Sequence, residues 1–160
     1  MIETKRLTLR EFTLDDREEV FRLSQEEGIK RWLNNQTYAN EEKAATVLSN
    51  LIEQYRLRDS EVFVLAIDLK HPKKLIGHIG YSTYDDEYEI GFAIADEHKR
   101  KGYAKEAIKA FTEFSFMEHG VSLIAVVEKD NKASIHTVKS CGYKKVKEFQ
   151  NKIIFESELK

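Results

Sequence analysis

The 160-residue sequence is poor in cysteine and proline, with one of each, Cys141 and Pro72. A single cysteine excludes an intramolecular disulfide and fits a reducing compartment, so we expect a cytoplasmic protein. Neither Cys141 nor the five histidines stand at the spacings of known metal motifs. The sequence therefore predicts no metal site.

Long apolar runs and a large charge of one sign are also missing. No segment approaches the roughly 20 apolar residues that a membrane helix needs, and the N-terminus has no apolar signal-peptide core. The 26 basic and 28 acidic residues leave a formal net charge of −2, which gives no overall basic footprint for nucleic acid. We therefore expect neither a membrane nor a nucleic acid as partner.

The composition that remains is that of an ordinary globular chain, with 41% hydrophobic and 34% charged residues. The length fits a single domain over residues 1–160, and no repeat or Pro/Gly/Ser-rich linker interrupts it. A monomer and a homodimer are both compatible with the sequence.

Hydrophobic periodicity changes along the chain and predicts a mixed α+β fold. Helical stripes follow Asp15, the expected N-cap Asn40 and Gly102, and a short helix is expected over 131–140. Strands are expected over 5–10, 62–67, 75–81, 88–94, 123–127, 144–149 and 152–158, with 28–38 irregular. Short connections predict an antiparallel meander over 62–94, and the strand–helix–strand order over 88–127 predicts a parallel pair.

The segment most informative about chemistry is Lys99-Arg100-Lys101-Gly102-Tyr103-Ala104, which precedes an amphipathic helix. The start of a helix has backbone N–H groups without partners and is the positive end of its dipole. Gly102 allows close approach of a ligand, and three basic residues add charge, so the segment suits a pyrophosphate. Spacing alone fits a solvated basic loop equally well.

Three blocks of sequence resemble the GCN5-related N-acetyltransferase (GNAT) family. Residues 89–94, 99–104 and 106–107 follow its core motif of Arg or Gln, two residues, Gly, one residue, then Gly or Ala, with Lys99 in first place. Residues 131–134 with 141–143 resemble the family's last helix, and residues 3–10 are similar to the RimJ/RimL-type ribosomal-protein N-acetyltransferases. The resemblance covers nearly the whole chain.

The resemblance implies a GNAT fold with a central mixed, mostly antiparallel sheet of six to seven strands, flanked by about four helices. Its two splayed parallel strands, one ending near Ile94 and the other over 123–127, would hold acetyl-CoA as cosubstrate. The resemblance further implies that backbone groups of Phe92, Ala93 and Ile94 hold the pantetheine arm. The residues implied to hold the pyrophosphate are Lys99, Arg100, Lys101, Gly102, Tyr103 and Ala104, and Asn131 is implied to contact the cofactor or orient the thioester.

The activity implied by the resemblance is acetyl transfer to a primary amine, with a protein α-amine as first expectation from the RimJ/RimL-like opening. Small amines, including polyamines and aminoglycoside-like molecules, stay open as acceptors. A non-catalytic CoA-binding module is the alternative from another class. It is kept because Val138 stands where many relatives carry a tyrosine as general acid.

Two residues are candidate catalytic groups. Glu89 is the candidate base, although a strand carboxylate that faces solvent or pairs with lysine fits as well. Ser134 is the candidate acid or thiol-binding group, although its hydroxyl could bond its own helix backbone. Trp32 and Tyr38 are candidate acceptor contacts, with core packing as the other interpretation of Trp32. The turn 85–87, Asp-Asp-Glu, either favours a cationic acceptor or is only a solvated turn.

Overall fold

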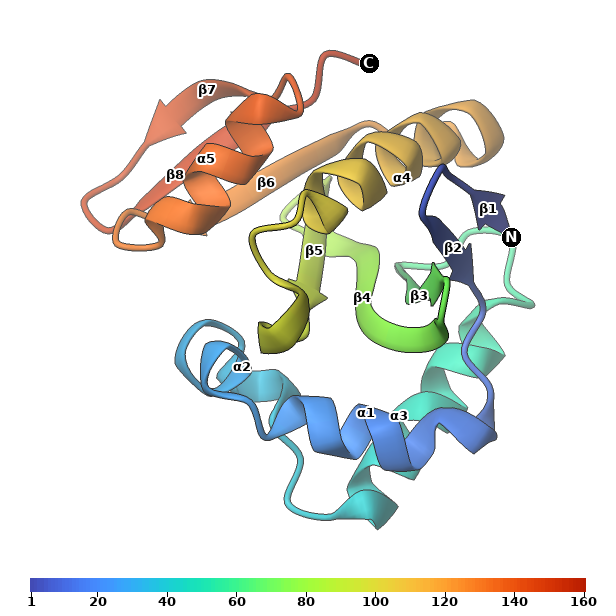
Figure 1. Cartoon of the computed structure of the whole chain (residues 1–160). Coiled ribbons are helices and arrows are strands. Elements are labelled where there is room, and N and C mark those ends of the chain that lie inside the picture. The colour runs from blue at the N-terminus through green and yellow to red at the C-terminus, as the bar shows by residue number, and fades with distance from the viewer.

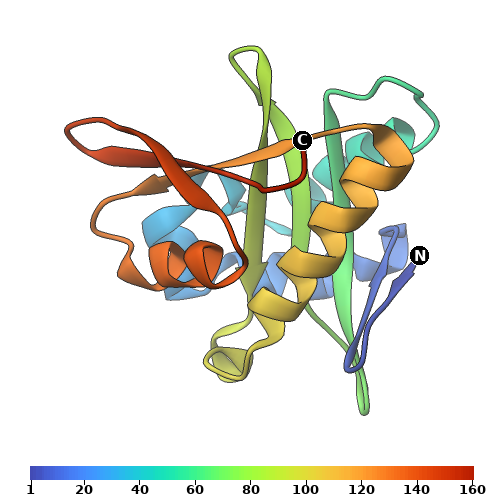
Figure 2. The same ribbon diagram turned by 90° about the horizontal axis from the view of Figure 1, so that it is seen from above.

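One eight-stranded sheet runs through the protein, with helices on both of its faces (Figures 1 and 2). The computed structural model describes the backbone of residues 1–160 and every side chain except those of Trp32 and Asn34. The strands are β1 (Ile2–Glu3), β2 (Leu7–Arg10), β3 (Val62–Lys70), β4 (Lys73–Tyr84), β5 (Glu87–Ile94), β6 (Leu123–Glu128), β7 (Lys144–Glu148) and β8 (Lys152–Glu156). Their order across the sheet is β1-β2-β3-β4-β5-β6-β8-β7.

Four of the five α-helices follow predicted helical segments, and the fifth lies mostly in the segment that was expected to be irregular. The five are α1 (Arg17–Ser24), α2 (Glu27–Trp32), α3 (Glu41–Gln54), α4 (Tyr103–His119) and α5 (Lys132–Ser140), with short 3-10 helices η1 (Leu14–Asp16), η2 (Asn34–Gln36) and η3 (Asp96–His98). Asn40 caps α3, because its side-chain oxygen accepts a hydrogen bond from the Lys43 N–H at 2.9 Å. No helix among the described residues is both long enough and apolar enough to span a membrane.

The sheet separates two packed layers. Helices α1, α2 and α3 lie on one face, and α4 and α5 lie on the other (Figure 1). On the α4 face, Ile108 and Phe111 are fully buried in the main core. On the other face a smaller cluster forms around Phe12, Leu48 and Ala66. Each helical layer buries an apolar stripe against the sheet, which is the main source of stability in such folds.

The centre of the sheet holds its one parallel pair. Strands β2 to β5 pair antiparallel in sequence order, as the expected meander does. Strands β5 and β6 run parallel and pair at Tyr88 with Leu123 and at Glu89 with Ile124. Beyond these pairs β6 turns away from β5 (Figure 2). The splayed pair leaves the rest of β5 facing an opening in the sheet.

The predicted fold class is confirmed, and the differences lie in short or polar segments. The eighth strand is the two-residue β1, too short to give a periodic signal. The segment 28–38, expected to be irregular, contains most of α2 and all of η2. Strands β3 and β4 extend past the predicted limits because their hairpin pairs through polar residues as far as Lys70 and Lys73. Polar hairpin ends are invisible to a search for apolar runs.

Candidate active site

Two hollows meet at strand β5. The first, which we call the interstrand cleft, has a volume of about 890 Å³ and lies between β5, β6, α5 and the start of α4. The second, which we call the sheet-face cavity, has a volume of about 320 Å³ and lies between the sheet and α1, α2 and α3. Both are lined by Glu26, Ile29, Gly91, Ala93 and Ile94. The two hollows therefore share one wall.

The loop that follows β5 forms one end of the interstrand cleft. Arg100 and Gly102 both have left-handed backbones, with φ of 63° and 81°. Helix α4 begins at once, and its first hydrogen bond runs from the Glu106 N–H to the Gly102 carbonyl at 3.1 Å. The N–H groups of Tyr103, Ala104 and Lys105 precede that bond, and Gly102 has no side chain to cap them. A left-handed turn leading into a helix start suits a phosphate group.

Arg6, on the N-terminal segment, holds this loop and the start of α4 through its guanidinium group. Its Nη1 donates to the Lys101 carbonyl at 2.8 Å, and its Nε donates to a Glu106 carboxylate oxygen at 2.7 Å. Its guanidinium carbon lies 4.4 Å from the centre of the Tyr103 ring. A Cβ added at Gly102 would lie 3.2 Å from Arg6 Nη2. Arg6 therefore contacts three residues of the segment 101–106.

Glu106 links the first turn of α4 to the N-terminal segment. It accepts hydrogen bonds at 2.7 Å from the Thr4 hydroxyl and from the Arg6 backbone N–H, besides the guanidinium. Burial alone would raise its pKa, but the hydrogen bonds from Thr4 and Arg6 outweigh burial and lower the pKa of Glu106. The carboxylate stays charged and ties the first turn of α4 to the N-terminal segment.

The three basic residues of the loop do not act alike. The Lys99 amine lies 2.6 Å from an Asp96 carboxylate oxygen, so an ion pair already engages it. Lys101 is absent from the described lining of the cleft, although its carbonyl is held by Arg6. Arg100 lines the cleft and is exposed, and Lys105, which the sequence analysis did not single out, lines it too. A phosphate group at this loop would therefore meet backbone N–H groups more readily than lysine side chains.

Glu89 lies in the cleft beside the shared wall. In the pairing of β5 with β4, Glu89 lies opposite Ser82. It stands two residues before Gly91, so both residues are on the same face of β5. Burial raises the pKa of Glu89, and the charge of Lys152 opposes this rise. A carboxylate with a raised pKa holds a proton more readily, which suits a general base.

Helix α5 brings Asn131 and Ser134 to the opposite side of the cleft. The Asn131 side-chain oxygen caps the helix by accepting from the Ser134 N–H at 3.2 Å. Within the described part of the chain the Ser134 hydroxyl has no hydrogen-bond partner. Nearby, the Thr137 hydroxyl donates to the Ala133 carbonyl at 2.8 Å, as a helix hydroxyl commonly does. Ser134 therefore has a hydroxyl free to meet a ligand.

Helix α5 and the residues after it also carry Val138, Cys141 and Tyr143, which are buried or half-buried against the main core. Val138 is fully buried on the inner face of α5. Tyr143 is buried with its hydroxyl 2.8 Å from the Thr112 hydroxyl, and burial raises the pKa of Tyr143 to about 12. Burial also raises the pKa of the Cys141 thiol, which disfavours the thiolate. His136 lines the cleft, whereas Cys141 does not line it in the described structure.

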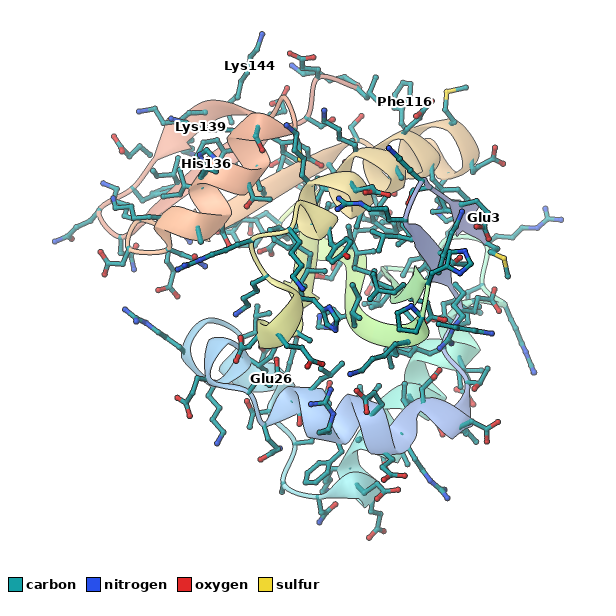
Figure 3. All side chains as sticks on the ribbon, viewed as in Figure 1. Glu3, Glu26, Phe116, His136, Lys139 and Lys144 are labelled. Carbon is teal, nitrogen blue, oxygen red and sulfur yellow. The ribbon has the colours of Figure 1, made fainter. Side chains whose placement is uncertain are left out.

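The sheet-face cavity contains Tyr38, one of the expected acceptor contacts, at its helical side. The other, Trp32, has a side chain outside the described part of the structure. The acidic turn 85–87 closes the β4–β5 hairpin and is exposed. Glu26 lies in the turn between α1 and α2 (Figure 3). Its Oε1 accepts a hydrogen bond from the Asp96 N–H, in the loop after β5, at 2.8 Å. His78, on β4, also lines the cavity.

Sequence reasoning did not identify Arg6, Glu26, His78 or Lys105 as site residues. Arg6 was within the N-terminal block that resembles the family, but nothing local to it indicates a contact with residues about 100 positions away. Glu26 and His78 sit in segments without a motif. No described group of three or more His, Cys, Asp or Glu side chains is arranged to hold a metal ion.

Comparison with known proteins identifies relatives over nearly the whole chain. A model of the acetyltransferase (GNAT) domain matches residues 6–144. The Bacillus subtilis (strain 168) protein named "Uncharacterized N-acetyltransferase YoaA" is 30% identical over 149 residues, which cover 91% of this chain and 83% of that protein. An acetyltransferase (GNAT family) from Bacillus anthracis has a similar structure, with a TM-score of 0.83 and 21% identity over 97% of this chain and 96% of that one.

Two other similar structures carry different names. A putative ribosomal-protein-serine acetyltransferase from Vibrio cholerae has a TM-score of 0.80 and 22% identity, covering 97% of this chain and 95% of that one. The Microcin C7 self immunity acetyltransferase MccE, in complex with acetyl-CoA and AMP, has a TM-score of 0.76 and 18% identity, covering 96% and 93%. At these identities the likeness establishes the fold and leaves the acceptor open.

Proposed function

Because the chain belongs to the GNAT acetyltransferase family, we propose that it transfers the acetyl group of acetyl-CoA to the α-amine of a peptide or protein. The family makes the chain an acetyl-CoA-dependent N-acyltransferase, and the α-amine is our further step. The observation that carries it is the shared wall at Gly91 and Ala93, where the interstrand cleft meets a second cavity beside Glu89. A transferase with two substrates needs such a meeting point.

Acetyl-CoA occupies the interstrand cleft in this proposal. Backbone groups of Phe92, Ala93 and Ile94 hold the pantetheine arm along the unpaired part of β5. The N–H groups from Arg100 to Ala104 hold the pyrophosphate. The Asn131 side chain already caps α5, so we assign its role to placing that helix beside the thioester. The left-handed turn and the uncapped helix start support this placement.

The reaction begins with removal of a proton from the acceptor ammonium group. An α-amino group has a pKa near 8, against about 10.4 for lysine, so it is much closer to its neutral form at pH 7. Glu89 accepts the proton, directly or through water. The neutral nitrogen then forms a bond to the thioester carbonyl carbon, and a backbone N–H near Ala93 or Ile94 stabilises the oxyanion.

Collapse of the tetrahedral intermediate breaks the carbon–sulfur bond and releases the CoA thiolate. The nitrogen of the intermediate loses its second proton to solvent as the amide forms, and the first proton, held on Glu89, returns to solvent before the next turnover. The Ser134 hydroxyl donates a hydrogen bond to the departing sulfur, and the thiolate takes up one proton. A free thiol has a pKa near 8.5, so this proton can come from solvent at neutral pH. Val138 supplies no proton, and the reaction relies on positioning for much of its rate.

The proposal is tested by calorimetry with acetyl-CoA, followed by a thiol-release assay. The acceptors are short peptides with free N-termini, spermidine and an amino sugar. We expect binding of acetyl-CoA and thiol release that depends on the peptides. Binding without release on any acceptor would favour the non-catalytic CoA-binding module, and absence of binding would overturn the assignment of the interstrand cleft.

A further inference from the structure

The sheet-face cavity carries information about the acceptor that neither the motif nor the relatives contain. From its lining, the geometry points to an acceptor that is a monoamine with one apolar group next to the amine, as in a peptide whose first residue is Leu, Met or Phe. This inference rests on the proposed transferase function and names its substrate class. It is argued from the position, charge and size of the cavity.

The position of the cavity places its contents beside the reacting atoms. Gly91 and Ala93 line both hollows, so a group in the cavity lies against the strand that we assign to the thioester. A Cβ added to Gly91 would meet no atom within 4 Å, which shows open space above the strand at this point. An amine at the shared wall would therefore direct its neighbouring substituent into the cavity.

The lining of the cavity is mostly apolar. Its apolar side chains come from three helices and three strands, with Phe12 from the segment between β2 and η1: Phe12, Val20, Leu23, Ile29, Val47, Leu48, Leu51, Val62, Val64, Leu75 and Ile94. An apolar substituent gains by leaving water for such a surface. A charged substituent would lose its hydration without finding a free countercharge, and a small hydroxyl substituent would bury less apolar area than an alkyl group.

Charge argues against an acceptor with several amines. Glu26 is the one carboxylate among the described residues that line the cavity. One of its oxygens already accepts from the Asp96 N–H, and the other lies 3.8 Å from an Arg22 nitrogen. A polyamine or aminoglycoside would bring further cations, and a cation in an apolar site is costly unless it is paired. The charge of the Glu89 carboxylate balances the charge of one ammonium group.

Apart from Glu26, the polar groups on the cavity surface are neutral. Burial lowers the pKa of His78 to about 4, so its imidazole is uncharged near neutral pH. The Gln36 Oε1 is buried and has no hydrogen-bond partner in the described structure. A peptide N–H would satisfy this oxygen, whereas a plain alkyl group would not. The cavity thus offers hydrogen bonding without added countercharge.

The size of the cavity sets a limit as well. Its volume of about 320 Å³ is near the lower end of the roughly 300–1,000 Å³ usual for small-molecule sites. One amino-acid side chain with its amine fits this space better than an amino sugar of several rings. Position, lining, charge and size therefore agree on a small apolar monoamine.

The test compares kcat/KM for the amides of Leu-Gly-Gly, Ser-Gly-Gly and Asp-Gly-Gly, with isoamylamine, spermidine and kanamycin. We expect kcat/KM of the Leu peptide to exceed that of the Ser peptide by about tenfold, as burial of one apolar side chain predicts. The Asp peptide, isoamylamine, spermidine and kanamycin should all rank below the Leu peptide. Isoamylamine shows whether an alkyl amine without peptide groups is accepted as well as the Leu peptide. Preference for the Ser peptide, spermidine or kanamycin would overturn the inference.

Two variants locate the preference in the cavity. Val47→Phe and Leu51→Phe each add bulk to α3 outside the catalytic groups, and either should raise KM for the Leu peptide about tenfold with unchanged affinity for acetyl-CoA. Val146→Phe is the matched control, because Val146 is 54% exposed on β7. Unchanged KM in both folded variants would contradict the inference.

Failure of the proposed function would look different. If no amine is acetylated although acetyl-CoA binds, the Leu peptide is titrated by calorimetry into the protein saturated with CoA. Binding of the Leu peptide over the Ser peptide would support the cavity assignment without catalysis. Equal binding, or none, would overturn it.

Discussion

The interstrand cleft and the sheet-face cavity share a wall but are built from different parts of the chain. The end of the cleft that we propose to hold the pyrophosphate is made of backbone N–H groups from consecutive residues around Gly102. The cavity is made of side chains from segments far apart in sequence, from Phe12 to Ile94. A backbone site leaves a local motif in the sequence, whereas a side-chain cavity leaves none.

This difference has a consequence for specificity. In the proposed function, backbone groups bind a part common to every acyl-CoA, and such a site tolerates change in most side chains. The shape of the cavity changes when any of about a dozen lining side chains is substituted, and these side chains also pack between the helices and the sheet. We infer that cosubstrate binding and acceptor choice are separable by mutation. The predictions below test that separation, from the largest expected effect to the smallest.

Substitution Gly102→Glu should abolish binding of acetyl-CoA. The left-handed φ of 81° strains any other residue, and a carboxylate here opposes the pyrophosphate, so affinity should fall by about 100-fold or more. Calorimetry with acetyl-CoA measures the loss. Gly120→Glu is the matched control, since Gly120 has φ of 67° at the other end of the same helix with nothing near its missing Cβ. Equal affinity in a folded Gly102→Glu would refute the backbone site.

Substitution Glu89→Gln should lower kcat by about 100-fold near neutral pH, the usual scale for loss of a general base. Burial raises the pKa of Glu89, and the base works only when deprotonated, so the wild-type rate should fall as pH drops through that raised value. At high pH the amine loses its proton unaided, and the gap should narrow. The control is Glu87→Gln, because Glu87 is an exposed residue two positions earlier on β5. Parallel rate–pH profiles would remove Glu89 as base.

Substitution Arg6→Ala should weaken acetyl-CoA binding by about tenfold, because the loop loses the donor that holds the Lys101 carbonyl. Acetyl-pantetheine, which lacks the pyrophosphate, should be used as well by the variant as by the wild type. Arg6→Lys should recover part of the affinity. The control Arg10→Ala breaks an ion pair with Asp68 on the next strand and should alter stability alone. Equal losses with both acyl donors would assign Arg6 a merely structural role.

Substitution Ser134→Ala should lower kcat by about fivefold, the scale of one net hydrogen bond, with KM for acetyl-CoA nearly constant. Thr137→Val is the comparison, because the Thr137 hydroxyl already bonds the Ala133 carbonyl. Single-turnover thiol release measures both. A larger loss from Thr137→Val than from Ser134→Ala would show that the free hydroxyl has no part in thiol departure.

The sequence was sufficient for the fold class and for the position of the turn that leads into α4. Helical stripes, the Asn40 cap and the strand–helix–strand order all match the structure, because each rests on contacts between near neighbours. The motif predicted the turn at Gly102, but the left-handed Arg100 and the ion pair of Lys99 with Asp96 had no sequence signal.

The parts that could not be predicted depend on distant pairing. Arg6 contacts Glu106 across 100 positions, and the cavity exists because α2 forms where no periodicity favours a helix. A helix of six residues is too short to be stable alone, so its tertiary contacts decide it. The Glu26 bond to the Asp96 N–H, just before α2, is one such contact.

The divergence of β5 and β6 leaves a sheet that is incomplete at its centre. Past Glu89 and Ile124 no pairing between these strands is recorded in the described structure, so amide hydrogens of β5 that face the gap depend on water. We expect them to exchange quickly with deuterium in the free protein and slowly once a ligand with its own amide groups fills the gap. The cosubstrate would then act as a missing strand, and its cellular concentration would set how firmly the two halves of the fold are held together.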